Sequence, residues 1–236
     1  MKISLVIPAF NESALIRETV TAAEAYLSRE FEEYELLVVN DGSRDGTAEI
    51  LAGLASETVK ILGYPDNRGK GCAVKTGVLA AMGDIVFYTD ADLAYGLDVL
   101  KTAAALFGDA ETRLVAGSRK LPGGGYGEYP LIRRLASKCF SLVQYAVSGM
   151  LYDTQCGFKG FRAEEVRAIF SAVREDGFAF DFEVLSIAER RGAKIAQLPV
   201  TIVNHRSSDV RLLRDSIRML RAIYAIRRRL KTGAER

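Results

Sequence analysis

The fold is decided by one stretch of the sequence, Asp84-Ile85-Val86-Phe87-Tyr88-Thr89-Asp90-Ala91-Asp92-Leu93. Its apolar run of β-branched and aromatic residues is typical of a buried strand. The run ends in two carboxylates, Asp90 and Asp92, and buried anions are costly without compensating positive charge. A divalent metal would provide that charge and leave positions for phosphate oxygens. The alternative is a loop Asp followed by an Asp that caps the next helix. The pair taken alone does not decide between the two.

Strands and helices are expected to alternate on both sides of this stretch. That βαβ pattern predicts an α/β fold, with a mostly parallel, twisted sheet and helices on both faces. Ligands of such sheets bind beyond the carboxyl ends of the strands. The expected strands are 3–8, 34–40, 59–63, 84–89 and 112–116, and the expected helices are 12–28, 47–55 and 72–82.

Four polar segments follow expected strands, so they should gather at one edge of the sheet, where they favour a nucleotide. They are Asn11-Glu12, Asp41-Gly42-Ser43, Asn67 to Gly71 and Asp90-Ala91-Asp92. Asn67-Arg68-Gly69-Lys70-Gly71 places two cations and two glycines where a helix begins, which suits an anion. A solvated basic turn is the alternative for that segment. Neither a G-x-G-x-x-G nor a G-x-x-x-x-G-K-[ST] motif occurs, so a dinucleotide domain and a P-loop are not expected.

The length of 236 residues predicts one large domain, or a domain with an appendage, and 49% hydrophobic residues suffice for a core. No run is long enough to span a bilayer, and the start lacks the cleavage site of a signal peptide. Three widely spaced cysteines suggest a reducing cytoplasm. The net charge of +2 is uneven, because nine Arg or Lys and two Asp give residues 206–231 a charge of +7. This basic segment is expected to meet something anionic.

Four ordered motifs together resemble family 2 of the inverting glycosyltransferases, which have the GT-A, Rossmann-like fold and use nucleotide-activated sugars. They are Pro8-Ala9-Phe10-Asn11-Glu12, Asn40 to Thr47, Asn67 to Gly71, and Asp90-Ala91-Asp92. Any one of them is weak evidence, but four in this order are specific. The family usually has Asp-Asp where this chain has Asn40-Asp41, which places more weight on Asp41.

The resemblance implies a role for each matching residue. Asp90 and Asp92 would be the Asp-x-Asp that holds Mg²⁺ or Mn²⁺ on the diphosphate, and Lys70 would lie near the nucleotide. The base and ribose would be bound by Pro8, Ala9, Glu12 and Asp41, and the remaining donor-site residues would be Asn11, Gly42, Ser43, Asn67, Gly69, Gly71 and Ala91.

Two segments of the second half resemble the dolichyl-phosphate β-glucosyltransferases and, more loosely, the polyprenyl-phosphate mannosyltransferases. They are Asp153 to Phe161 and Phe180 to Leu185, which opens a late helix with Asp181 expected as its N-cap. Before them, the glycine-rich residues 121–127 are expected to form a lid or a plain surface loop. Residues 131–150 predict an amphipathic helix that lies at an interface or packs on the core. Acceptor-side residues would be Gln155, Cys156, Gly157 and Asp181.

A lipid phosphate as acceptor fits this chemistry. Its oxygen is already anionic at neutral pH and needs no strong general base, but it needs positive charge to position it. The alternative for any single arginine is a surface cation. The candidates are Arg119, Arg133 or Arg134, and Arg206, with Ser137 on the helical face of Arg133.

Residues 208–236 are expected to form a basic amphipathic helix appended to a glycosyltransferase domain of residues 1–207. It is typical of a membrane-surface or partner-binding helix, whereas nucleic acid is disfavoured because no aromatic residues alternate with the arginines. We expect a peripheral protein on the cytoplasmic face of a membrane, held there directly or by a membrane partner protein. The expected apolar stripe is Val210, Leu213, Ile217, Leu220 and Tyr224.

The predicted function is a metal-dependent, inverting transfer of a hexose, most simply glucose from UDP-glucose, to a polyprenyl or dolichyl phosphate. Asp92 and the arginines would carry the chemistry. A GDP-mannose donor is one alternative. A soluble saccharide or protein acceptor is another, and it would need Asp181 or Glu183 as a base. A nucleotide-sugar-binding scaffold without turnover is the third.

Overall fold

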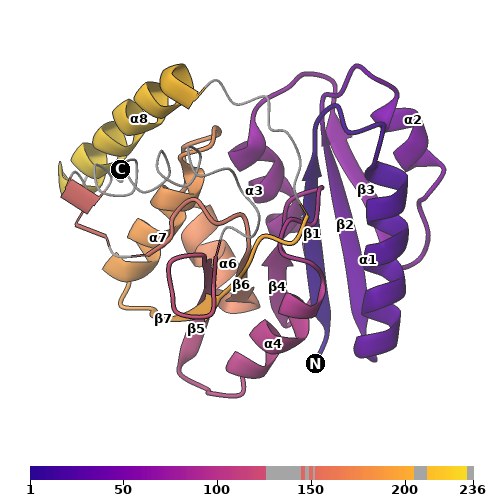
Figure 1. The fold of residues 1–236 in the computed structure, drawn as a ribbon, viewed down its shortest axis with the longest axis horizontal. Helices are drawn as coiled ribbons and strands as arrows, with labels where there is room; N and C mark the ends of the chain where they lie inside the picture. The colour runs from indigo at the N-terminus through magenta and orange to yellow at the C-terminus, as the bar shows by residue number, and fades with distance from the viewer. Residues whose placement is uncertain (126–144, 147–148, 151, 205–211, 233–236) are drawn as a thin grey trace.

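The computed structural model describes residues 1–125, 145–146, 149–150, 152–204 and 212–232. Within them, the strands form one sheet in the order β3-β2-β1-β4-β6-β5-β7 (Figure 1). Only β6 runs antiparallel to its neighbours β4 and β5, so the predicted mostly parallel sheet is confirmed. The strands are β1 (Ile3–Ala9), β2 (Tyr34–Asp41), β3 (Val59–Tyr64), β4 (Ile85–Tyr88), β5 (Thr112–Ser118), β6 (Lys159–Arg162) and β7 (Lys194–Pro199).

Helices cover both faces of the sheet, as the alternating pattern predicts. Side chains alternate along a strand, so Leu5 and Ile7 of β1 pack in one core and Val6 packs in the other. The first core lies under α1 (Ile16–Glu30), α2 (Thr47–Ala52) and α4 (Asp98–Leu106). The second core lies under α3 (Lys70–Ala80), α6 (Ala163–Phe170) and α7 (Phe180–Arg190), and α8 (Leu212–Thr232) packs on α7.

The helix expected from residue 12 begins later, at Ile16. The residues before it form a turn, in which Asn11 and Glu12 hydrogen-bond to the segment that follows β2. Asn11 has a φ of 55°, in the left-handed region that Asn tolerates. No pattern in the sequence predicted α4, α6, β6 or β7. The predicted interface helix 131–150 lies almost wholly outside the described residues.

The C-terminal helix packs on the protein through apolar residues beside the predicted stripe. Ile223, Ile226 and Leu230 are buried in the second core, whereas Tyr224 of the predicted apolar stripe is 65% exposed and Leu220 is half-buried. The protein's own core thus takes the row of apolar residues next to the stripe, and contact of the stripe with a membrane surface or a partner stays a prediction. Val210 lies outside the described residues. The part of the chain that is described contains no helix long and apolar enough to cross a bilayer.

Candidate active site

The polar segments after β1 and β2 meet at the carboxyl edge of the sheet, as predicted. The backbone N–H of Asn11 donates to Ser43 Oγ at 2.9 Å, and Asn11 Oδ1 accepts the N–H of Arg44 at 2.8 Å. The N–H of Glu12 donates to Thr47 Oγ1 at 2.9 Å. Pro8 and Ala9 are the last residues of β1, so they end at this junction.

Asp41 fixes the next segment rather than standing open to solvent. Its carboxylate is buried and accepts the N–H groups of Arg68 at 2.8 Å and Gly69 at 3.0 Å, and Asn67 Nδ2 at 2.9 Å. Gly42 has a φ of +66°, and a Cβ there would lie 2.4 Å from the backbone nitrogen of Asn67. Asp41 and Gly42 therefore hold residues 67–69 directly against the end of β2, while contact of Asp41 with a base stays a prediction.

The start of α3 is partly satisfied by protein groups. The carbonyl oxygen of Asp176 accepts the N–H groups of Gly71 at 2.8 Å and Cys72 at 3.3 Å. These are N–H groups that a helix N-terminus would otherwise offer to an anion. The positive charge at this turn therefore comes chiefly from the side chain of Lys70, which forms an ion pair with Asp90.

Asp90 and Asp92 place unbalanced negative charge after β4. Burial lowers the pKa of Lys70, but the charges of Asp90 and Asp181 outweigh that effect and raise it above its usual value. Burial and the charge of Asp90 raise the pKa of Asp92 to about 6. Asp92 Oδ1 accepts the N–H of Ala94 at 3.1 Å, but α4 begins only at Asp98, so Asp92 does not cap a helix.

This arrangement fits a divalent cation that would be coordinated both by these carboxylates and by the oxygens of a diphosphate. Asp90 and Asp92 bring two carboxylates to the end of β4, and Lys70 pairs with one of them, Asp90. The described residues contain no group of three or more His, Cys, Asp or Glu side chains that could hold a metal ion. A cation at Asp90 and Asp92 would therefore need further ligands. Carboxylate, phosphate and water oxygens are ligands that Mg²⁺ prefers.

The predicted acceptor-side segment touches Asp90. A Cβ on Gly157 would lie 2.0 Å from Asp90 Oδ2, so the carboxylate packs directly on this glycine. The N–H of Gly157 donates to Tyr95 Oη at 3.3 Å, and Cys156 is fully buried beside it. Gln155 Nε2 is a buried donor without a hydrogen-bond partner in the described part of the chain. A ligand oxygen at this place would satisfy it.

Asp181 belongs to a buried charge cluster and does not cap α7. The N-cap is Ala179, and Asp181 lies inside the first turn. Its Oδ1 accepts Lys159 Nζ and Tyr88 Oη, each at 2.5 Å, and Lys159 Nζ also donates to the carbonyl of Cys156 at 2.7 Å. The expected N-cap is therefore wrong, because the fully buried Lys159 needs this carboxylate as its partner. Burial and then the charge of Asp181 raise the pKa of Tyr88 well above its usual range.

Arg119, a predicted acceptor contact, forms a two-point pair with Asp153. Nε donates to Asp153 Oδ2 and Nη2 to Oδ1, both at 2.8 Å, and the backbone N–H of Arg119 donates to Oδ2 at 3.0 Å. Burial alone would raise the pKa of Asp153, but the hydrogen bonds and charge of Arg119 lower it to about 2. Contact of Arg119 with an acceptor stays a prediction. The other acceptor candidates, Arg133, Arg134, Ser137 and Arg206, lie outside the described residues.

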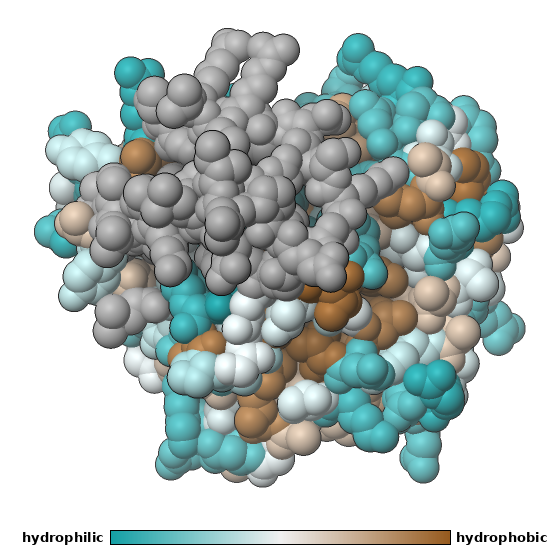
Figure 2. Space-filling model, in the orientation of Figure 1, coloured by the Kyte–Doolittle hydropathy of each residue, from teal (hydrophilic) through white to brown (hydrophobic). Residues whose placement is uncertain are grey.

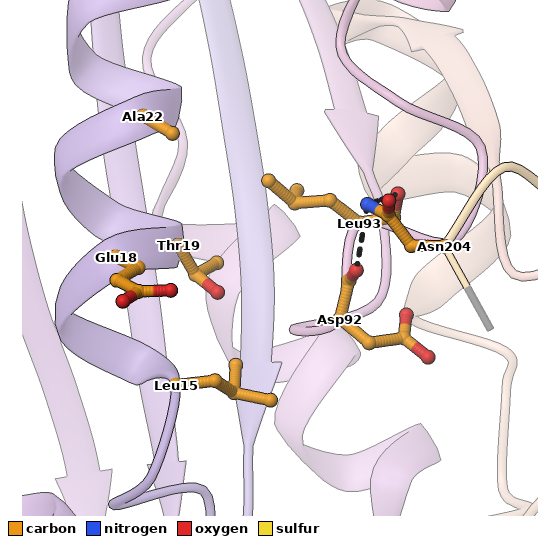
Figure 3. Close-up of a pocket in the computed structure, with 7 residues that line it drawn as sticks. All are labelled: Leu15, Glu18, Thr19, Ala22, Asp92, Leu93 and Asn204. Atoms are coloured by element: carbon orange, nitrogen blue, oxygen red, sulfur yellow. Dashed lines mark hydrogen bonds between the residues drawn. The ribbon is translucent and has the colours of Figure 1, made fainter. Parts of the chain in front are cut away.

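A hollow of about 270 Å³ lies between α1 and the turn after β4. Figure 3 shows Leu15, the N-cap of α1, and Thr19 of α1 on one side, and Asp92, Leu93 and Asn204 on the other. Asn204 Nδ2 donates to the carbonyl of Leu93 at 2.9 Å, and Thr19 Oγ1 donates to that of Ala91 at 2.6 Å. The space-filling view shows apolar residues in the lower middle of the molecule, over α4 and this turn (Figure 2).

Sequence reasoning missed several residues that hold the site together. Lys159 lies within the segment Asp153 to Phe161, and no role was predicted for it, although its ammonium forms an ion pair with Asp181. The others stand in no recognisable motif, and only the tertiary fold brings them to the site: Thr19, Tyr95, Asp176 and Asn204.

The mostly parallel sheet with helices on both faces defines an α/β fold of the GT-A type. Among solved structures, the mannosyl-3-phosphoglycerate synthase of Rubrobacter xylanophilus has a TM-score of 0.68 at 24% identity, covering 99% of this chain and 75% of that one. A glucosyl-3-phosphoglycerate synthase of Mycobacterium tuberculosis, solved with Mn²⁺ and UDP-glucose, has a TM-score of 0.67 at 23% identity, covering 95% and 78%. These likenesses show the fold.

The family model described as Glycosyl transferase family 2 matches residues 4–170, so the chain belongs to that family. A dolichyl-phosphate beta-glucosyltransferase of Trichomonas vaginalis is 35% identical over 84% of this chain and 62% of its own length. The enzyme of that name in Homo sapiens is 28% identical over 100% of this chain and 78% of its own. The glycosyltransferase AglD of Haloferax volcanii is 33% identical over 93% of this chain and 36% of its own length. The chain thus spans little more than three fifths of the first relative and about a third of the last.

Proposed function

We propose that this chain transfers glucose from UDP-glucose to a polyprenyl or dolichyl phosphate with inversion at the anomeric carbon. The observation that carries the proposal is the contact between the donor and acceptor motifs. Asp90 is paired with Lys70 on one side and packs on Gly157 on the other. The relatives named as dolichyl-phosphate beta-glucosyltransferases support the choice of sugar and acceptor.

The donor would lie over the carboxyl edge, with its diphosphate toward Lys70 and its carboxylate neighbours. Asp90 and Asp92 would hold a divalent metal, Mg²⁺ or Mn²⁺. When bound, the metal supplies Lewis-acid stabilisation to the diphosphate leaving group. Asp41 would act chiefly by keeping residues 67–69, and with them Lys70, in place.

An oxygen of the lipid phosphate would attack the anomeric carbon from the face opposite the nucleotide. The new carbon–oxygen bond is β, and the bond to the diphosphate breaks with its electron pair. No base is needed, because the attacking oxygen carries no proton at neutral pH. The burial of Asp181 and Glu183 with the cations Lys159 and Arg229 agrees with this and disfavours either as a base for a neutral hydroxyl.

The outward side of α8 would meet an anionic lipid surface, on the cytoplasmic side of a membrane. Three of its apolar residues, Ile223, Ile226 and Leu230, are buried in the core, and its exposed cations would contribute to the attachment. Each basic residue near such a surface contributes ~1 kcal/mol. The exposed cations include Arg218, Arg221 and Lys231.

Replacing Asp92 tests the proposed site. Asp92→Ala should abolish transfer of radiolabelled glucose to a short polyprenyl phosphate while circular dichroism shows an intact fold, because the metal loses one of its two carboxylates. Asp98→Ala, which removes an exposed carboxylate six positions further on, is the matched control and should stay active. A folded Asp92→Ala protein that transfers at the normal rate would refute the assignment.

The same assay separates the rival functions. Transfer from GDP-mannose alone would change the donor, and transfer to a soluble saccharide without lipid would change the acceptor. Tight binding of the nucleotide-sugar with no turnover on any acceptor would indicate a scaffold.

A further inference from the structure

The C-terminal helix α8 is anchored to α7 by charge as well as by apolar packing. The guanidinium of Arg229 forms an ion pair with the carboxylate of Glu183, which is fully buried. The guanidinium of Arg190 donates to the carbonyl of Leu230. Breaking a buried pair by removing one partner is costly, because it leaves the other charge uncompensated. Glu183 and Arg229 therefore fix where the last turns of α8 lie.

Glu183 also holds the loop that precedes α7. Its second oxygen, Oε2, accepts the backbone N–H of Arg174 at 3.0 Å and that of Glu175 at 2.8 Å. Within the loop, the N–H of Gly177 donates to Glu175 Oε1 at 3.0 Å. A carboxylate that accepts successive backbone N–H groups fixes a loop whose backbone has no strand to pair with. One side chain thus binds both α8 and residues 174–177.

That loop lies directly on the start of α3. Asp176 accepts the N–H groups of Gly71 and Cys72. A Cβ on Gly69 would lie 2.4 Å from the oxygen of Asp176, and one on Gly71 would lie 2.5 Å from the oxygen of Glu175. The backbones of the two segments are in direct contact at Gly69 and Gly71, which have no side chain that could move to accommodate a shift of the loop. A displacement of residues 174–177 must therefore move residues 69–72, and Lys70 with them.

We propose that Glu183 and Arg229 are positioning residues for the donor site, acting through residues 174–177 on Lys70. This rests on the proposed function, which places the donor diphosphate at Lys70 and Asp90. The contacts form one connected path, from α8 through α7 and the loop to the first turn of α3. The helix expected at the lipid surface is thereby coupled to the affinity for the nucleotide-sugar.

Three variants of the full chain test the coupling. Arg229→Gln and Glu183→Gln each remove one charge of the pair, and the glutamine at 183 can still accept backbone N–H groups. Arg228→Gln removes the same charge from the neighbouring exposed residue and is the matched control. Arg229→Lys keeps the charge and should recover most of the effect. If Arg229→Gln does not fold, Glu183→Gln, which removes the other charge of the pair, carries the test.

Two measurements are needed, and both are made without lipid. Hydrogen exchange of the amides of residues 69–73, without ligand, should be faster in Arg229→Gln and Glu183→Gln than in the wild type and Arg228→Gln. Calorimetry should show UDP-glucose binding weakened by roughly fivefold or more, within the usual range of coupling between sites. Transfer assays should then show a raised KM for the donor, with kcat at saturating donor and the KM for the lipid phosphate little changed.

The outcomes separate the positioning role from the proposed function. If folded Arg229→Gln exchanges and binds UDP-glucose like Arg228→Gln, the positioning role is overturned. If the two variants exchange faster at residues 69–73 but even the wild type binds no nucleotide-sugar, the proposed function fails while the mechanical coupling stands.

Discussion

Gly157 leaves room for the carboxylate that the whole site depends on. Gly157→Ala would place a Cβ 2.0 Å from Asp90 Oδ2, so Asp90 must move. Since misplacement by about 1 Å can cost about 100-fold in rate, transfer should fall by about that factor. The fold should survive, as measured by circular dichroism and a thermal scan.

Gly53→Ala is the control for this change, because its Cβ would have 3.6 Å to the nearest atom. It should transfer at nearly the normal rate. A Gly157→Ala protein that matches the control would mean that the position of Asp90 does not matter for the reaction.

The Arg119–Asp153 pair should make stability depend on pH. The pKa of Asp153 is lowered to about 2 in the folded protein, so its contribution is present above the unfolded value of about 4 and is lost as pH falls toward 2. Asp153→Asn leaves a buried guanidinium without its anion and should lower the free energy of unfolding by about 3–5 kcal/mol at pH 7. Urea unfolding at pH 7 and pH 3 should show a smaller difference from wild type at the lower pH.

A surface carboxylate with the same pKa direction serves as the comparison. Asp109 pairs with Lys194 in the open, and its pKa is also lowered to about 2. Asp109→Asn should have little effect, because exposed pairs contribute little. If Asp153→Asn were as stable as Asp109→Asn, the buried pair would have no structural role.

For single residues, the sequence predicts which side chains belong to the site better than it predicts which side chains they pair with. The sequence predicts Asp90 and Asp92 as site residues because they are paired carboxylates after a strand. It predicts Lys70 because it is a cation where a helix begins. The pairing of Asp181 with Lys159, and of Arg119 with Asp153, depends on side chains brought together from 22 and 34 positions apart. No local pattern encodes such a distance.

Among the elements, α8 shows how far a helical pattern determines its own orientation. Ile226→Ala should lower the free energy of unfolding in urea by about 2–5 kcal/mol, because Ile226 is buried in the second core. Tyr224→Ala should change it by less than about 0.5 kcal/mol, because Tyr224 is 65% exposed. The reverse order would mean that the row of Tyr224, and not that of Ile226, packs on the protein.

The elements that were predicted correctly are those whose periodicity is strong and whose ends carry turn residues. β1, β2 and β4 are buried on both sides of the sheet, which makes them continuous apolar runs. β6 has only four residues, Lys159–Arg162, and two are charged, so nothing local marks it as a central strand. α8 has two neighbouring apolar rows, so the sequence did not predict which of them packs on α7.

Across the whole molecule, the predicted donor and acceptor motifs meet at Asp90, at one edge of the sheet. The helices of the proposed coupling, α3, α7 and α8, lie together with α6 on one side of the sheet (Figure 1). The order of the motifs predicted the edge, because parallel strands present their carboxyl ends together. It did not predict that α8 would pack against the same layer as the start of α3.

The measurement that tests the central claim most directly is transfer of radiolabelled sugar to a short polyprenyl phosphate, with UDP-glucose and GDP-mannose supplied separately. Each reaction is run with Mg²⁺ or Mn²⁺ and with a chelator, and the organic phase is counted. We predict metal-dependent counts from UDP-glucose and background counts from GDP-mannose. Background counts from both donors, together with metal-dependent transfer to a soluble acceptor, would contradict a lipid-phosphate glucosyltransferase.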